Sequence, residues 1–223
     1  MAMKFSRKEG IHLHISNMNI SSLKEYFENE YDDDPDEIVH LECFDNNLVS
    51  LEGCPQNVRE LWCHRNLLES LEGCPPRLEK LYCHYNYLTS LRGCSPTVKK
   101  LWCNENELTT LYGCPAGVTE LLCFNNELVS LEFAPANYEI LVARCNPLNK
   151  EWHCLTDKER RKKISMKRFT RGLAIVKGTR KDQIVRRFCE RLLHKWYTPD
   201  ENGVAPYAMW TWHKFQQELN QFV

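Results

Sequence analysis

The chain has 223 residues, of which 43% are hydrophobic and 26% are charged, as is ordinary for a protein that folds around an apolar core. It contains no run of about 20 apolar residues and begins without a hydrophobic segment of signal-peptide length, so we expect a cytoplasmic protein with no membrane span. The net charge of −1 conceals a division, because residues 21–150 carry 21 acidic and 10 basic residues, whereas residues 151–223 carry 8 acidic and 16 basic ones.

The first 37 residues predict a small cap. Residues 11–15 alternate apolar and polar side chains, as a half-buried strand does. Ser22 followed by Glu25 is typical of a capping box, so we expect a short amphipathic helix to begin directly after Ser22. The acidic run 32–34 is expected to be an exposed loop before the next element.

A 20-residue unit then repeats five times without a gap and is followed by a partial sixth copy. The copies begin at Leu41, Leu61, Leu81, Leu101, Leu121 and, for the partial one, Leu141. The full copies share the pattern L-x-C-x-x-N-x-L-x-x-L-x-G-C-P, from which the third copy departs at Ser95 and the fifth at Phe133 and Ala134. A single unit of this length cannot bury its own apolar side chains, so the units must stack into a solenoid.

Each part of the pattern has a structural interpretation. In L-x-C the leucine and the cysteine point inward, as alternate residues of a strand do. The asparagine amide can satisfy backbone groups of neighbouring coils, and the glycine permits the unusual dihedral angles of a tight corner. Nine of the 12 cysteines recur with the 20-residue period, which favours small core residues over crosslinks.

The pattern resembles the leucine-rich-repeat family in its short 20-residue class, and it is similar to repeats of bacterial effectors and of large DNA viruses. The resemblance covers residues 36–150. It implies an α+β solenoid, a horseshoe of about six coils with one parallel sheet. We therefore divide the chain into an N-terminal cap (1–37), the leucine-rich-repeat solenoid (38–155) and a basic helical C-terminal segment (156–223).

The residues between the inward leucines and cysteines are expected to form an aromatic stripe on the concave face, because Trp62, Tyr82 and Trp102 occupy the same position of neighbouring coils. These rings could bind a partner, or they could only stack on one another and stiffen the sheet. We favour a protein-binding site. Its predicted members are Trp62, His64, Arg65, Tyr82, His84, Tyr85, Trp102, Glu105 and Phe124.

Catalysis and metal binding are not expected. His64 and His84 each follow an inward cysteine, but adjacent strand residues point to opposite faces and cannot hold one ion, and no C-x-x-C pair is present. Some bacterial effectors with similar repeats carry a ubiquitin-ligase domain with a Cys-x-Asp motif, which neither Cys154 nor Cys189 matches. Gly-rich phosphate loops are absent as well. The sequence therefore predicts a non-enzymatic interaction or assembly module without a cofactor, and the viral resemblance implies a virion component or an adaptor in the host cytosol.

The C-terminal segment is predicted to be helical. Thr156 and Glu159 form a second capping box, and two further apolar faces follow within 184–196 and 208–222. These helices could form a bundle or pack on the solenoid, and the sequence leaves both open. A basic patch is expected at Arg160, Arg161, Lys162, Lys163, Lys167, Arg168, Arg186 and Arg187. Its expected partner is an acidic protein surface or a second copy of the chain, with nucleic acid as the alternative.

Overall fold

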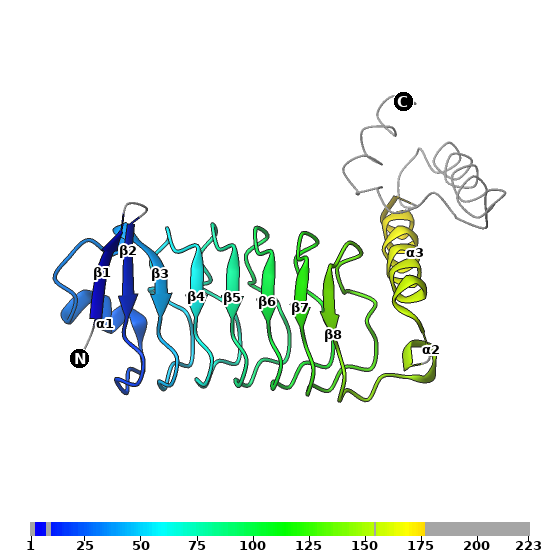
Figure 1. Ribbon diagram of the computed structural model, residues 1–223, viewed down its shortest axis with the longest axis horizontal. Helices are drawn as coiled ribbons and strands as arrows, with labels where there is room; N and C mark the ends of the chain where they lie inside the picture. The colour runs from blue at the N-terminus through cyan, green and yellow to red at the C-terminus, as the bar shows by residue number, and fades with distance from the viewer. Residues whose placement is uncertain (1–2, 8–9, 154, 177–223) are drawn as a thin grey trace, which may run out of the picture. The chain divides into compact units, whose positions relative to one another are not determined.

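The computed structural model describes residues 3–7, 10–153 and 155–176, and it places the repeats in one solenoid (Figure 1). The chain forms two compact units, 1–165 and 166–223, and the described part of the second is the end of one helix. The elements in chain order are β1 (Met3–Arg7), β2 (Gly10–His14), α1 (Leu23–Asn29), a 3₁₀ turn (Pro35–Glu37), β3 (Ile38–Glu42), β4 (Glu60–Trp62), β5 (Lys80–Tyr82), β6 (Lys100–Trp102), β7 (Glu120–Leu122), β8 (Ile140–Val142), α2 (Lys150–His153) and α3 (Asp157–Val176). The predicted helices beyond residue 176 lie outside the described residues.

The strands form one sheet in chain order, in which every neighbouring pair from β2 to β8 is parallel. From β3 onward the register advances by one repeat per strand, so that Leu41 lies beside Leu61 and Leu61 beside Leu81. The predicted solenoid is thereby confirmed. The antiparallel hairpin of β1 and β2, which pairs Met3 with His14, was not predicted, since it is held by backbone pairing at the end of the sheet and lies outside the repeat.

A ladder of asparagines joins the coils at the turn after each strand. The Asn86 side chain donates to the carbonyl oxygens of Cys63 and Cys83, both at 3.1 Å, and its amide oxygen accepts from the Leu68 backbone N–H at 2.9 Å. Equivalent bonds recur at each of these asparagines from 46 to 146. Backbone groups that the turn would leave unpaired are thus bonded to the neighbouring coil, which confirms the predicted role of the asparagine.

The core lies between the sheet and the returning segment of each coil. The strand leucines from Leu41 to Leu121 and the cysteines two residues after them are fully buried. Burial raises the pKa of the Cys43 thiol to about 12, so the thiol stays protonated at neutral pH. All cysteines among the described residues are free thiols. The cysteine series therefore packs the core, as predicted.

Glycine is required at the corner of the coil. Gly73 has a φ of +86°, and a Cβ atom placed there would lie 2.6 Å from the backbone carbonyl carbon of Leu51. A side chain would thus meet both an unfavourable dihedral angle and the backbone of the preceding coil. Gly93 and Gly113 repeat this geometry.

Both ends of the solenoid are covered. At the N-terminal end, Ser22 caps α1 by accepting from the backbone N–H of Glu25 at 3.2 Å, and Leu23 is fully buried. At the other end Trp152 of α2 and Ile164 of α3 are fully buried in the same core. The domain boundaries given above stay a prediction. Among the described residues, no helix has the length and apolar character needed to cross a membrane.

Candidate functional site

The sheet presents an open face that consists of three rows of side chains. Side chains of a strand point alternately into the core and away from it. In the second coil Leu61 and Cys63 are buried, whereas residues 60, 62 and 64 are only half-buried and each contribute one side chain to a row. We call these rows the first row (His40, Glu60, Lys80, Lys100, Glu120), the middle row (Glu42, Trp62, Tyr82, Trp102, Leu122) and the third row (Phe44, His64, His84, Asn104, Phe124). The middle and third rows contain most of the residues that the sequence analysis selected.

The middle row contains the predicted aromatic stripe. The ring centroids of Trp62 and Tyr82 are 4.4 Å apart, and those of Tyr82 and Trp102 are 4.9 Å apart with nearly perpendicular planes. Tyr82 is only 7% exposed because an indole covers it on each side, whereas both tryptophans are half-buried. The three rings therefore stiffen the sheet together, and the two indoles supply most of the surface that a partner would meet.

The third row is a stack of parallel rings. Phe44 and His64 are stacked at 4.5 Å, and His64 and His84 at 4.3 Å with 6° between their planes. Burial lowers the pKa of His64, and burial together with the positive charges of its neighbours lowers that of His84 to about 4. The Nδ1 atoms of both are buried, and no described residue bonds to them. At neutral pH the stack is uncharged and acts as an aromatic surface.

The first row fixes the indoles with carboxylates that are themselves paired. Glu60 accepts from the Trp62 Nε1–H at 3.0 Å and from the Lys80 ammonium at 2.8 Å. Glu120 likewise accepts from Trp102 Nε1–H and from the ammonium of Lys100, each at 2.8 Å. The hydrogen bond from Lys100 lowers the pKa of Glu120, so its carboxylate stays ionised at neutral pH. Both indole N–H groups are thus satisfied, and the orientation of the two rings is fixed before any partner arrives.

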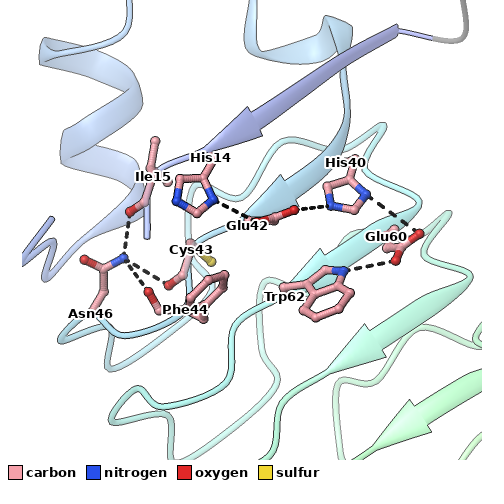
Figure 2. Close-up of polar contacts among 9 residues, drawn as sticks. All are labelled: His14, Ile15, His40, Glu42, Cys43, Phe44, Asn46, Glu60 and Trp62. Atoms are coloured by element: carbon pink, nitrogen blue, oxygen red, sulfur yellow. Dashed lines mark hydrogen bonds and ion pairs between the residues drawn. The ribbon is translucent and has the colours of Figure 1, made fainter. Parts of the chain in front are cut away.

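Histidines extend this network toward the N-terminal end (Figure 2). The Glu42 carboxylate bonds to His14 Nδ1 at 2.7 Å and to His40 Nε2 at 3.1 Å, and His40 Nδ1 lies 3.7 Å from the Glu60 carboxylate. Burial tends to raise the pKa of Glu42, but the bonds from both histidines bring it below its usual value. A continuous polar chain therefore connects His14 with Trp62.

The first row was not predicted to be part of the site. The signal was present, since the strand alternation that places Trp62 outward also places Glu60 outward two residues earlier. The 20-residue repeat alone does not predict the ion pair between neighbours in this row, because Lys80 reaches Glu60 only after the coils have stacked in register.

Three of the predicted residues lie on the turn after the strand rather than on the sheet face. Arg65, Tyr85 and Glu105 adopt left-handed φ values of 53° to 55°. The Arg65 guanidinium lies 5.6 Å from the centre of the Tyr85 ring, and Glu105 accepts from the Asn125 side chain. The Tyr85 ring lies 5.7 Å from that of His84, so the turn continues the third row outward.

Three basic residues at the start of α3 are engaged within the described chain. Arg160 lies 3.5 Å from Asp157 in an ion pair, and the Arg161 guanidinium is 4.4 Å from the centre of the Tyr138 ring. The Lys163 ammonium pairs with Glu151 at 2.8 Å. Lys162, Lys167 and Arg168 also belong to α3. Arg186 and Arg187 lie outside the described residues.

Residues 3–7, 10–153 and 155–176 bring together no group of three histidine, cysteine, aspartate or glutamate side chains arranged to hold a metal ion.

The 20-residue register and the asparagine ladder decide the class of fold. The fold is a solenoid of the leucine-rich-repeat type. No family model and no curated protein matches its sequence. Among solved structures it is similar to YopM from Yersinia enterocolitica WA-314, with 26% sequence identity and a TM-score of 0.43 over 51% of this chain. The matched part spans 30% of the YopM chain.

Proposed function

We propose that this leucine-rich-repeat protein is a non-enzymatic interaction or assembly module that binds a protein partner through the open face of its sheet, the face that the resemblance predicts to be concave. The observation that carries the proposal is the contiguous middle row, in which Trp62, Tyr82 and Trp102 contact one another across three coils. Tryptophan and tyrosine are the residues most enriched among those that dominate binding energy at protein interfaces.

The paired charges around the rings support this function. Lys80 and Lys100 are neutralised by Glu60 and Glu120, and these carboxylates also bind the indoles. A partner therefore meets ring surfaces already held in one orientation, so little side-chain freedom is lost on binding. Because the lysines of the first row are already paired, they repel a positively charged partner less than unpaired lysines would. The ion pairs also mark one edge of the proposed contact.

Replacing both half-buried indoles tests this proposal. Partners are first identified by crosslinking the full chain in its native extract, and their affinity for Trp62→Ala/Trp102→Ala is then measured by calorimetry. Loss of two interface tryptophans should weaken binding by about 100-fold or more. Tyr112→Ala, which removes a 47% exposed aromatic side chain in another part of the coil, is the matched control. Wild-type affinity in a double variant that melts as one cooperative unit would contradict the proposal.

The biological role of such an interaction module is proposed from the family resemblance alone. Similarity to repeats of bacterial effectors and large DNA viruses favours an adaptor in the host cytosol or a component of a virus particle. The crosslinked partners distinguish these roles, since capsid proteins support the second and host signalling proteins the first.

Nucleic-acid binding by the basic segment is the second candidate. It is favoured by the composition of residues 157–195, which include 15 basic and 4 acidic residues. Against it, Arg160, Arg161 and Lys163 already contact other parts of the chain. Mobility shifts of DNA and RNA at two salt concentrations test it, because phosphate binding must weaken steeply with salt. An absent shift at low salt would leave an acidic protein surface or a second copy as the partner of this segment.

A further inference from the structure

A second surface follows the asparagine ladder along one edge of the solenoid. After each strand the chain turns at the ladder asparagine, and the residues one before, one after and three after it face outward. We call these positions (45, 47 and 49 in the first coil, and their equivalents through 125, 127 and 129) the Asn-turn edge. In Figure 1 they belong to the loops that follow the arrowheads of β3 to β7.

Exposed apolar side chains gather on the Asn-turn edge. Eight large hydrophobic side chains are exposed among the described residues, and five of them lie on this edge. These five are Val49 (60% exposed), Leu67 (40%), Tyr85 (47%), Tyr87 (50%) and Val129 (53%). Single exposed apolar residues are normal on a protein surface, but their concentration along one edge is typical of a contact surface.

Backbone bonds between coils bring the central members together. The Leu67 N–H donates to the Leu48 carbonyl, and the Tyr87 N–H to the Leu68 carbonyl, both at 2.9 Å. Leu67 and Tyr87 therefore occupy equivalent places on adjacent coils, about 4.8 Å apart. Tyr85 lies two residues before Tyr87 on the same turn, so the three exposed residues form a cluster of neighbouring positions at the centre of the edge.

Acidic side chains surround this cluster. The Asn-turn edge contains five acidic residues and one basic residue: Asp45, Glu69, Glu105, Glu107 and Glu127, with Arg65. Arg65 is already engaged with Asp45 at 3.6 Å. No ion pair joins Glu107 or Glu127 to any residue in the described part of the chain. The edge therefore combines an apolar centre with uncompensated negative charge beside it.

We propose that the Asn-turn edge is a second docking surface, and that its partner is a basic amphipathic segment of another protein. Apolar side chains of the segment would cover Leu67, Tyr85 and Tyr87, while lysines or arginines would meet Glu107 and Glu127. Five coils span about 20 Å, which a helix of about 13 residues matches in length. A nucleic acid is repelled by these carboxylates, and a purely apolar partner would leave them without a counter-charge.

A labelled model peptide tests this surface directly. The probe is an 18-residue amphipathic helix of leucines and lysines, and its binding to the full chain is measured by fluorescence anisotropy. Leu67→Ser/Tyr87→Ser should weaken binding about tenfold or more through loss of apolar contact. Glu107→Gln/Glu127→Gln should weaken it several-fold at low salt and reduce its salt dependence, because two screened charge contacts are lost.

Matched variants separate this surface from non-specific attraction to an acidic protein. Glu72→Gln/Glu139→Gln removes two exposed carboxylates elsewhere on the solenoid, and Tyr112→Ser removes an exposed aromatic ring away from the edge. Both should retain wild-type affinity. Equal weakening by the control and the edge variants, or full binding to Leu67→Ser/Tyr87→Ser, would overturn the proposal.

The open face must be excluded as the binding site of the probe. Trp62→Ala/Trp102→Ala should bind the peptide as the wild type does. If this variant alone loses the peptide, the probe occupies the open face, and the Asn-turn edge proposal falls while the proposed function stands. If the wild type self-associates and Leu67→Ser/Tyr87→Ser abolishes that association, the edge belongs to a second copy, which also overturns the proposal.

Discussion

Replacing Asn86 with alanine removes three buried hydrogen bonds at the centre of the ladder. The carbonyl oxygens of Cys63 and Cys83 lose a donor, and the Leu68 backbone N–H loses its acceptor. Asn86 is only 6% exposed, so water reaches the abandoned groups poorly. A buried polar group that loses its partner costs about 1–3 kcal/mol, and partial relaxation of the turn brings the expected total to about 3–5 kcal/mol. That is a large part of the stability of an ordinary domain.

The loss should depend on position along the ladder. Asn146 makes equivalent hydrogen bonds in the last coil, but it is only half-buried, so water can replace some of these hydrogen bonds after the substitution. We therefore expect Asn146→Ala to cost less than half as much as Asn86→Ala. Urea unfolding followed by circular dichroism measures both, with the exposed Asn137→Ala as control. A free energy of unfolding for Asn86→Ala within about 1 kcal/mol of the wild type would refute the assigned role of the ladder.

Three further predictions follow from the geometry of single residues. Gly73→Ala should lower the free energy of unfolding by about 2 kcal/mol or more in thermal melts, because its φ of +86° and the backbone of the preceding coil oppose a Cβ atom. As a control, Gly117→Ala should be nearly neutral, because a Cβ atom there would meet only the flexible side chain of a lysine. The pKa of His84 is lowered to about 4 in the folded chain, so the unfolded chain binds the proton first. Stability should accordingly be constant above the unfolded pKa of about 6.5 and fall between pH 6.5 and 4, by at most about 3 kcal/mol from this residue; a His84 ring that titrates near pH 6.5 by NMR would contradict this. Finally, a thiol reagent at pH 8 should modify the exposed Cys145 rapidly and the buried Cys83, whose pKa burial raises, only on unfolding, as peptide mapping would show.

Much of the architecture could be predicted from the sequence because each feature recurs with the 20-residue period. The alternation around Trp62 determines which side chains face outward, and the spacing of the asparagines places each beside its equivalent in the next coil. Local chemistry also identified the starts of α1 and α3, since Ser22 accepts from the Glu25 backbone N–H and Thr156 from that of Glu159, as a capping box requires. These are relations within about 20 residues of chain, which a sequence displays directly.

The contacts between coils were decided only by the tertiary structure. Tyr82 is covered by its neighbours on both sides, although its position in the repeat is the same as that of two more accessible tryptophans. The pairing of Lys80 with Glu60 and the stacking of His64 on Phe44 depend on register and side-chain rotamers across adjacent strands. An identical repeat position can therefore be core, support or contact surface, because its surroundings come from the coils on either side and not from its own.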